Sequence, residues 1–166
     1  MKIDYYKLYA AAHHNAVDLL EEAELLYGKG KYARAYFMAF TGLEEIAKSQ
    51  LAADVYSNLI TEEEFNKHFS NHKRKIGRVL WATLDAQGYF IDSKEEIDRL
   101  EQEHPKAKDR MAAIYCDVLD DRVVSPRDII GKNEAGEIIR VLEVAIQRII
   151  EVEFMQGRIG TKGFMK

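Results

Sequence analysis

The chain has 166 residues, of which 47% are hydrophobic and 31% are charged, and it contains only two prolines. This composition is typical of one soluble, helix-rich globular domain and excludes an intrinsically disordered chain. The formal net charge of −4 argues against a protein coated in positive charge for tight, non-specific DNA binding, although a local basic patch can still bind nucleic acid.

The N-terminal part of the sequence predicts two long helices. Apolar residues recur every three or four positions over Tyr5–Tyr27 and again over about Lys31–Tyr56. Gly28 and Gly30 end the first helix. The short link "GKG" favours an antiparallel hairpin of the two helices.

Two capping boxes predict helix starts in the middle of the chain, "TEEE" (Thr61–Glu64) and "SKEE" (Ser93–Glu96). Between them, the spacing over Ile76–Leu84 predicts a core helix that stops near Gly88. After His104-Pro105 the segment "KAKDRMAAIYCDVL" predicts another helix. Its predicted inward-facing residues are Met111, Ile114, Tyr115 and Val118.

The C-terminal part predicts an N-cap pair and one long helix. Ser125 and Pro126 suit an N-cap and first-turn position, and the last helix is expected over about Glu134–Gln156. Strand signals are confined to the weak candidates "YFI" and "RVV". We therefore predict an all-α fold, a single up-and-down helical bundle over residues 1–157, followed by a frayed tail at residues 158–166.

Cysteine content and hydropathy indicate the compartment. Cys116 is the only cysteine, so one chain forms neither an internal disulfide nor a thiolate zinc cluster, and its apolar neighbours favour a buried small residue over a reactive thiol. The N-terminal "KIDYYKLYAAAHHNA" is too polar for a signal peptide, and no window holds the ~20 apolar residues of a membrane span. We expect a cytoplasmic protein without a membrane partner.

Two glutamates interrupt the apolar run "AFTGLEEIAKSQL" (Ala39–Leu51). On a helical wheel at about 100° per residue, Glu44 falls ~80° from Tyr36, inside the apolar arc, whereas Glu45 falls near ~180°, on the opposite, solvated face. A carboxylate inside a bundle is costly unless it is paired. Lys48, one turn later, is the expected partner of Glu44. The two form either an ordinary surface pair or the lining of a polar cleft.

Positive charge is concentrated in one segment, Lys67–Arg78 ("KHFSNHKRKIGR"), which holds five Lys or Arg and two His but no acid. If the segment is helical, His68 and His72 lie one turn apart on one face. The segment, with Arg74 and Lys75, either binds a phosphate or an RNA backbone or is a solvated helix end. A metal on two histidines needs further ligands that the sequence does not supply, so we predict no metal and no cofactor.

Residues 14–51 resemble the helical hairpin of the AbiV-type (abortive infection) branch of the HEPN superfamily, where "NA..LL.EA..L" precedes a glycine-containing turn and "YARA...A...LEEIAKS". Three later pieces agree with the same pattern: "NHKRK" (Asn71–Lys75), "R.AAIYCD" (Arg110–Asp117) and "SP.D" (Ser125–Asp128). The resemblance covers most of the chain. It implies an all-α HEPN bundle, usually dimeric, and a link to phage defence or toxin-like systems.

The resemblance also implies a chemistry, because many HEPN proteins are metal-independent RNases with the motif Arg, a polar residue, several more, then His. The histidine takes the proton of a ribose 2′-hydroxyl, and the arginine stabilises charge on the phosphate. The only Arg-x4-His spacing in this chain is Arg99 to His104, and Leu100 stands where the motif has a polar residue. Arg99 and His104 are therefore the second choice for a catalytic pair.

The first choice is a site built from the positions that match the AbiV-like blocks. These positions, with the neighbouring Arg74, are Glu44, Lys48, His72, Arg74, Lys75, Arg110 and Asp117. His72 is the proton-transfer candidate, because the ordinary pKa of histidine lies near neutrality. Lys75 and Arg110 would contact phosphate, and Glu44 would orient a basic partner. Asp117 either belongs to the site or is a helix-end hydrogen-bond acceptor.

Three functions follow from these readings: an RNA-binding or RNA-cleaving effector, a non-catalytic nucleotide- or protein-binding module such as the partner of a toxin, and a ferritin-like di-iron bundle. The di-iron site needs two inward Glu-x-x-His motifs, but only "EQEH" (Glu101–His104) occurs. The last helix is apolar over most of its circumference, and this apolar surface is larger than a single bundle can bury. We therefore expect a homodimer, as the family resemblance also implies.

Overall fold

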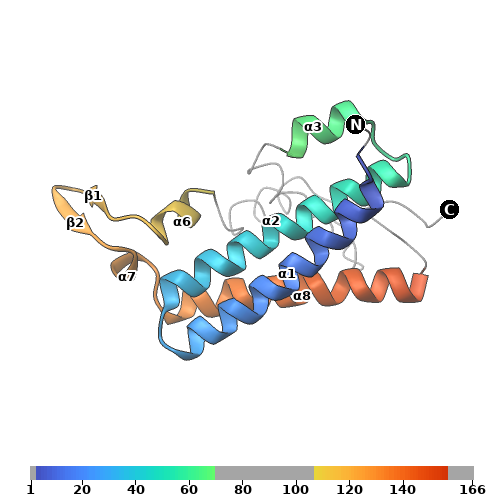
Figure 1. The fold of residues 1–166 in the computed structure, drawn as a ribbon. Helices are drawn as coiled ribbons and strands as arrows, with labels where there is room; N and C mark the ends of the chain where they lie inside the picture. The colour runs from blue at the N-terminus through green and yellow to red at the C-terminus, as the bar shows by residue number, and fades with distance from the viewer. Residues whose placement is uncertain (1–2, 70–106, 157–166) are drawn as a thin grey trace, which may run out of the picture.

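The computed structural model describes residues 3–69 and 107–156. Three long helices dominate this part of the chain: α1 (Tyr5–Gly28), α2 (Tyr32–Tyr56) and α8 (Lys132–Gln156). α1 and α2 run antiparallel side by side, and α8 packs across both of them (Figure 1). The predicted all-α fold, with an N-terminal hairpin of long helices and a long C-terminal helix, is confirmed.

The turn between α1 and α2 closes as the glycine pattern predicted. Asp4 caps the start of α1 by accepting a hydrogen bond from the Lys7 N–H at 3.0 Å. At the other end, Gly30 has a φ of 69°, a left-handed conformation that glycine adopts at little cost. This turn lets the Lys31 N–H reach back to the Leu26 carbonyl at 2.9 Å.

The main core lies between the three long helices. α1 contributes small residues to it, including Ala16 and Ala23, which allow α2 to approach closely. α2 and α8 supply most of the large side chains, and the fully buried ones include Phe40, Leu43, Ile46, Ile138 and Leu142. At Gly42 the two helices come so near that an added Cβ would lie 2.5 Å from Leu142 Cδ2.

A second core cluster joins α3 (Glu62–Phe69) to the ends of α1 and α2. Phe65 of α3 is buried and packs edge-on against Tyr5, with ring centroids 5.2 Å apart. The predicted capping box fixes the start of α3, because the Glu64 N–H donates to Thr61 Oγ1 at 3.2 Å and the Glu64 carboxylate accepts from the Thr61 N–H at 2.9 Å. The hydrogen bonds that the Glu64 carboxylate accepts from the Thr61 N–H and from the Thr61 hydroxyl hold the pKa of Glu64 below its ordinary value.

The segment after Ala107 corrects one predicted helix. α6 (Ala107–Ala112) has only six residues, and a hairpin of β1 (Asp117–Leu119) and β2 (Arg122–Val124) follows it. The turn residues Asp120 and Asp121 both have positive φ, and the β-branched valines on either side favour strands. "RVV" is therefore a strand, as its weak signal indicated. Of the four residues predicted to face the core, Ile114 is partly buried, and the other three are exposed: Met111 (49%), Tyr115 (58%) and Val118 (63%).

Cys116, predicted to be buried, is also exposed in this segment. It lies in the irregular stretch between α6 and β1. Ala113 is the fully buried residue of this stretch. The alanine therefore takes the core position that the sequence assigned to larger neighbours.

α7 (Pro126–Ile129) and α8 begin where the sequence predicted, within two residues. Asp128 accepts hydrogen bonds from the Ser125 N–H at 2.8 Å and the Ser125 hydroxyl at 2.7 Å. α8 buries Ile138, Leu142 and Ala145. The helices expected over Ile76–Leu84 and after Ser93, and the tail at residues 158–166, lie outside the described residues. No helix within residues 3–69 and 107–156 has the length and hydrophobicity of a bilayer span.

Candidate functional site

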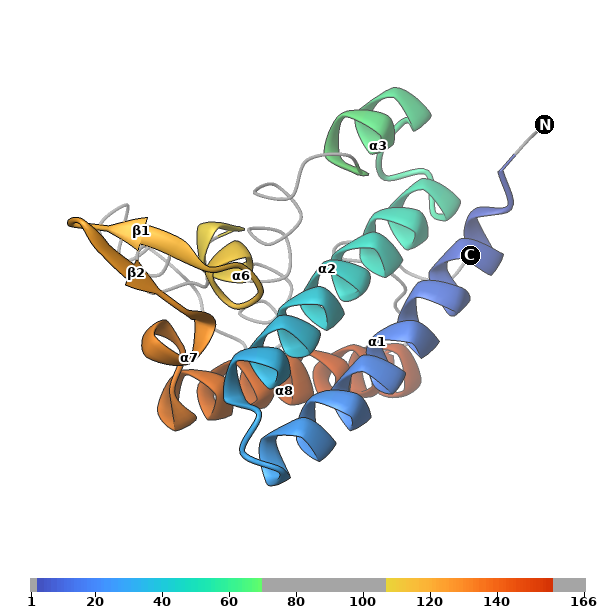
Figure 2. The same cartoon turned by 60° about the vertical axis from the view of Figure 1, so that its left-hand side comes forward.

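Glu44 lies at the middle of α2 and points into the protein. Its exposed fraction is 3%, so the prediction from the helical wheel is confirmed. α2 lies between α1 and α8 on one side and α6 on the other (Figure 2). Because α6 covers the side of α2 that the α1–α2 hairpin leaves open, the carboxylate is enclosed between elements far apart in the sequence.

Arg110 of α6 supplies a positive charge to this carboxylate. Arg110 Nη1 lies 3.9 Å from Glu44 Oε2, and the side chains are 25% and 5% exposed, respectively. At this distance the two groups form an ion pair without a direct hydrogen bond. Little water screens the pair on the glutamate side, so the attraction is stronger than that of a surface pair.

The guanidinium of Arg110 has a second contact, with an aromatic ring. Its Cζ lies 5.1 Å from the ring centroid of Phe37, which is within the range of a cation–π interaction. Phe37 precedes Glu44 by two helical turns on the same side of α2, so both residues hold Arg110 from one helix. Arg110 Nε is buried and has no hydrogen-bond partner in the structure. The arginine is thus fixed in position while part of its hydrogen-bonding capacity stays open.

Lys48 corrects the predicted partner of Glu44. Its Nζ forms an ion pair with Glu45 Oε1, one turn away. The same ammonium lies 5.9 Å from the ring centroid of Phe69 of α3. Lys48 is therefore bound to Glu45 and to the end of α3.

Glu45 itself is also less exposed than predicted. Its side chain is only 12% exposed, whereas the wheel placed it on a solvated face. The reason is that α2 is buried over more of its circumference than a one-sided helix, since Gly42, Ser49, Ala52 and Ala53 are buried as well. A helical wheel that assumes one apolar face cannot predict the burial of both glutamates when the helix is buried on several sides.

Asp117 does not join the Glu44–Arg110 pair among the described residues. It lies exposed at the first position of β1, where its Oδ1 accepts a hydrogen bond from the Val118 N–H at 2.8 Å. Asp117 is thus a local hydrogen-bond acceptor at the start of a strand, and the alternative that placed it at a helix end is wrong.

Of the remaining predicted site residues, one lies within the described residues and the others lie outside them. His68 lies half-exposed near the end of α3. His72, Arg74, Lys75, Arg99 and His104 lie outside the described residues. The pairing of His68 with His72, and the choice between His72 and His104 as the catalytic histidine, therefore stay predictions.

Sequence reasoning missed two features of the described part. Phe37 supports Arg110 and could have been found from its seven-residue spacing to Glu44. His13 carries a buried Nδ1 with no hydrogen-bond partner, and burial, with a smaller effect of His14, lowers its pKa. No local sequence signal marks His13, because its burial depends on tertiary packing.

The site can bind an anion but is not complete within the described residues. Arg110 offers a held guanidinium, a group that suits phosphate oxygens. The sequence predicts His72, which lies outside the described residues, as the proton-transfer group of this site.

Comparison with known proteins identifies the family. The sequence model of the HEPN_AbiV family, described as AbiV, matches residues 4–147. No curated protein and no solved structure matches the chain. The matched range includes the α1–α2 hairpin, Glu44, Arg110 and the first half of α8. The chain therefore belongs to the HEPN_AbiV family, the abortive-infection AbiV-type branch of the HEPN proteins.

Proposed function

We propose that this protein acts on RNA in phage defence, in the cytoplasm, as a metal-independent RNA-cleaving HEPN protein. The observation that carries the proposal is the position of Arg110, which is held between Glu44 and Phe37 with its side chain 25% exposed. Family membership supports the link to abortive infection. The proposed chemistry depends on Arg110, His72 and Lys75.

Arg110 suits the binding of a phosphodiester better than a surface arginine does. Its guanidinium stays charged at all physiological pH values and presents donors in a planar fork that matches phosphate oxygens. The buried carboxylate of Glu44 and the ring of Phe37 restrict its rotamers, so little side-chain entropy is left to lose when a ligand binds. With both contacts in place, a quarter of the Arg110 side chain stays exposed.

The proposed reaction needs a base next to this arginine. His72 takes the proton from a ribose 2′-hydroxyl, and the 2′ oxygen forms a bond to the adjacent phosphorus while the bond from phosphorus to the 5′ oxygen breaks. Water protonates the leaving 5′ oxygen, and the products carry a 2′,3′-cyclic phosphate and a 5′-hydroxyl. Arg110, with Lys75, stabilises the extra negative charge on the phosphate.

An RNA-degradation assay with EDTA tests this function. We expect the wild type to cleave RNA with EDTA present, and His72→Ala to abolish cleavage without changing the circular dichroism spectrum. His14→Ala is the matched control, because His14 is exposed on α1 and lies outside the proposed site. If His104→Ala loses cleavage while His72→Ala retains it, the catalytic pair is Arg99 and His104.

A second function, a non-catalytic nucleotide- or protein-binding module, is favoured by one observation. Leu100 stands where the RNase motif of HEPN proteins has a polar residue. If purified wild-type protein binds RNA but cleaves none of it, this second function replaces the first.

We also propose that the protein is a homodimer, as its membership of the HEPN_AbiV family implies. Light scattering at micromolar concentration tests this, and the mass of a single chain would contradict it.

A further inference from the structure

The hairpin of β1 and β2 projects from the helical bundle and leaves apolar side chains in solvent (Figure 1). Val118 and Val123 are directly paired across its two strands, so their side chains lie on the same face of the hairpin. Both are more than half exposed, and Val123 reaches 79%. An isolated two-stranded hairpin is only marginally stable in water unless further strands or a helix cover it. The hairpin is therefore suited to adding strands from another chain.

The two edges of the hairpin differ in how their backbone groups are used. A two-residue turn follows Leu119, so Leu119 and Arg122 form the first hydrogen-bonded pair. Val118 and Val123, the next pair, then point their N–H and C=O groups away from each other, along the outer edges. On β1 the Val118 N–H is occupied, because it donates to Asp117 Oδ1 at 2.8 Å. On β2 the outward groups of Val123 have no partner in the described part of the chain, so β2 is the open edge.

Pairing of two copies on this edge satisfies both backbone groups of Val123 at once. A residue whose N–H and C=O both point outward exchanges two hydrogen bonds with its equivalent when two strands pair antiparallel about a two-fold axis. The result is a four-stranded sheet in the order β1, β2, β2, β1. In this sheet Val118 and Val123 of the two copies form one row of four β-branched side chains. The edge is therefore complementary to itself.

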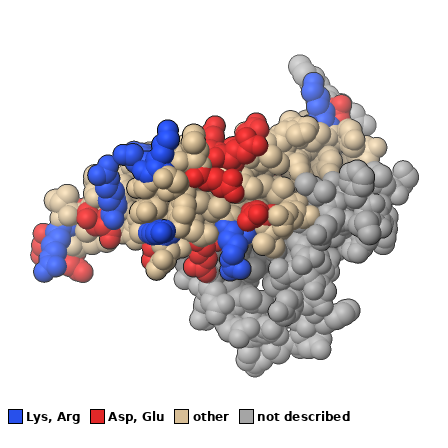
Figure 3. All heavy atoms as spheres, turned by 90° about the horizontal axis from the view of Figure 1, so that it is seen from below, with Lys and Arg blue, Asp and Glu red and all other residues tan. Residues whose placement is uncertain are grey.

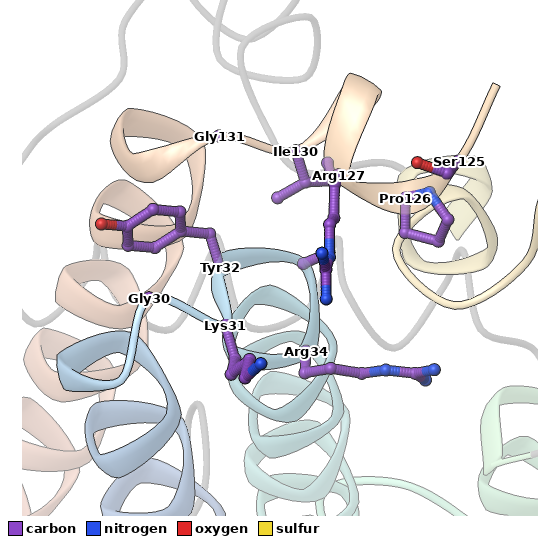
Figure 4. A pocket seen from close by; sticks show the side chains of 10 residues that line it. Gly30, Lys31, Tyr32, Arg34, Ser125, Pro126, Arg127, Ile130 and Gly131 are labelled. Atoms are coloured by element: carbon purple, nitrogen blue, oxygen red, sulfur yellow. The ribbon is translucent and has the colours of Figure 1, made fainter.

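A basic cavity of about 490 Å³ lies next to the end of β2, between the first turn of α2 and α7. Lys31 and Arg34 at the start of α2 line it, and Arg127 extends from α7 toward them (Figure 4). Among the described residues, no acidic side chain lines this cavity and none of the three cations forms an ion pair. The basic cavity therefore offers positive charge to an acidic group of another chain.

The turn of the hairpin, Asp120-Asp121, carries the opposite charge. Both aspartates are exposed, and neither forms an ion pair within residues 3–69 and 107–156. Seen from below, the left-hand end of the molecule carries acidic and basic side chains close together (Figure 3). Under the pairing centred on Val123, Asp121 lies opposite Ser125 of the second copy, two residues before its Arg127. The acidic turn of each copy thus reaches the basic cavity of the other, and the two-fold axis makes this contact twice.

We propose that β2 pairs with β2 of a second copy of this chain, with Val123 at the two-fold axis and the acidic turn of each copy facing the basic cavity of the other. The proposal rests on the homodimer proposed above and names the surface that forms it. Backbone pairing supplies affinity, and the two charged contacts fix the register, because a slip of one residue would place the valines of the two copies on opposite faces. Strands of three residues bury a small area, so the dimer belongs to the low end of interface sizes.

Sedimentation equilibrium of the full chain over about 1–100 µM measures the dissociation constant of the dimer. Val123→Pro removes the outward N–H without removing a hydrogen bond of the hairpin, so the hairpin tolerates it and the pairing of two copies does not. We expect the dissociation constant to rise about ten- to hundredfold, the effect of losing two backbone hydrogen bonds. Val123→Thr is the matched control, because it keeps the N–H and a β-branched side chain and should dimerise like wild type.

Variants of the charged residues test the register. Arg127→Glu should weaken the dimer about tenfold, because two attractive contacts become repulsive. Asp120→Asn with Asp121→Asn should weaken it less, because asparagine tolerates positive φ and removes only the attraction. Mixed in equal amounts, these two proteins should associate more tightly than Arg127→Glu alone, since the mixed pair regains one acidic turn facing one Arg127. Arg140→Gln is the control, because Arg140 is exposed on α8 outside this surface.

Two results would overturn the proposed pairing and leave the homodimer standing. A dimeric wild type whose folded Val123→Pro and Arg127→Glu variants have the same dissociation constant would place the dimer surface elsewhere. A loss of RNA affinity in Arg127→Glu, with an unchanged dissociation constant of the dimer, would assign the basic cavity to RNA. A folded wild type that stays monomeric at all concentrations contradicts the homodimer itself. None of these measurements depends on RNA cleavage.

Discussion

The carboxylate of Glu44 and the guanidinium of Arg110 lie 3.9 Å apart, although the two residues are more than sixty positions apart in the sequence. The glutamate is almost fully buried, whereas the arginine is a quarter exposed. The pair therefore links a buried side chain of α2 to a partly exposed side chain of α6. This asymmetry indicates that the glutamate positions the arginine, which remains available to a ligand.

Replacing Arg110 with methionine should destabilise the protein, because it leaves Glu44 without this positive neighbour. We expect a loss of about 2 kcal/mol in the free energy of unfolding, between the values for surface and fully buried pairs. The double variant Glu44→Gln with Arg110→Met should lose less than the sum of the single variants. Urea unfolding measures all three, and strictly additive losses would show that the two side chains do not interact.

Gly42→Ala should weaken the packing of α2 on α8. The new Cβ would lie 2.5 Å from Leu142 Cδ2, and Leu142 is fully buried. Overpacking of a core costs about 1–3 kcal/mol, partly offset by the better helix propensity of alanine, so we expect a net loss of about 1 kcal/mol. Thermal unfolding measures this loss.

Gly28→Ala is the matched control for this prediction. A Cβ at Gly28 would have nothing within 4 Å, so this substitution should leave stability unchanged or slightly higher. Equal stability of Gly42→Ala and Gly28→Ala would mean that Leu142 moves aside without cost.

The stability of the protein should fall, in part through His13, as the pH drops below about 6.5. Burial, with a smaller effect of His14, lowers the pKa of His13 in the folded state below its ordinary value of 6.5. The unfolded state then binds the proton first, so this contribution is fully present above pH 6.5 and is lost as the pH falls through the lower, folded pKa. His13→Gln should therefore flatten the pH dependence of the melting temperature.

His14→Gln serves as the control for this measurement, because burial is the larger cause of the His13 shift. It should retain most of the pH dependence that His13→Gln loses. A wild type and a His13→Gln variant with parallel pH profiles would show that His13 titrates alike in both states.

Thr61→Ala should loosen α3. The hydroxyl accepts a hydrogen bond from the Glu64 N–H, and loss of such a cap costs about 1 kcal/mol. We expect faster hydrogen exchange of the amides of α3, with unchanged exchange at the middle of α1. Exchange that rises equally in both helices would mean that α3 unfolds only together with the whole domain.

The parts of the fold that the sequence predicted correctly depend on local interactions. The α1–α2 turn follows from a glycine with positive φ, and the start of α3 follows from hydrogen bonds between Thr61 and Glu64. Burial of Glu44 followed from helical periodicity alone. In each case the deciding contact spans only a few residues, so local sequence is sufficient.

The incorrect predictions have two causes, a local turn that the helical spacing did not reveal and tertiary contacts of α2. The apolar residues after Ala107 have helical spacing, but the Asp120-Asp121 turn places the valines in two paired strands. Glu45 and Lys48 were misassigned because α2 is covered on several sides, which a wheel of one helix does not show. The contact of Phe37 with Arg110 joins residues more than seventy positions apart, a distance at which periodicity gives no information.

The central claim, that Arg110 contacts an RNA phosphate, is tested most directly by the salt dependence of RNA binding. Fluorescence anisotropy with a single-stranded RNA at several salt concentrations gives the slope of log affinity against log salt. We predict that Arg110→Gln binds more weakly than wild type and that its slope is smaller by about 0.7, the value for one lost phosphate contact on a single strand. Arg140→Gln should keep the wild-type slope. A folded Arg110→Gln protein with the same affinity and the same slope as wild type would contradict the claim.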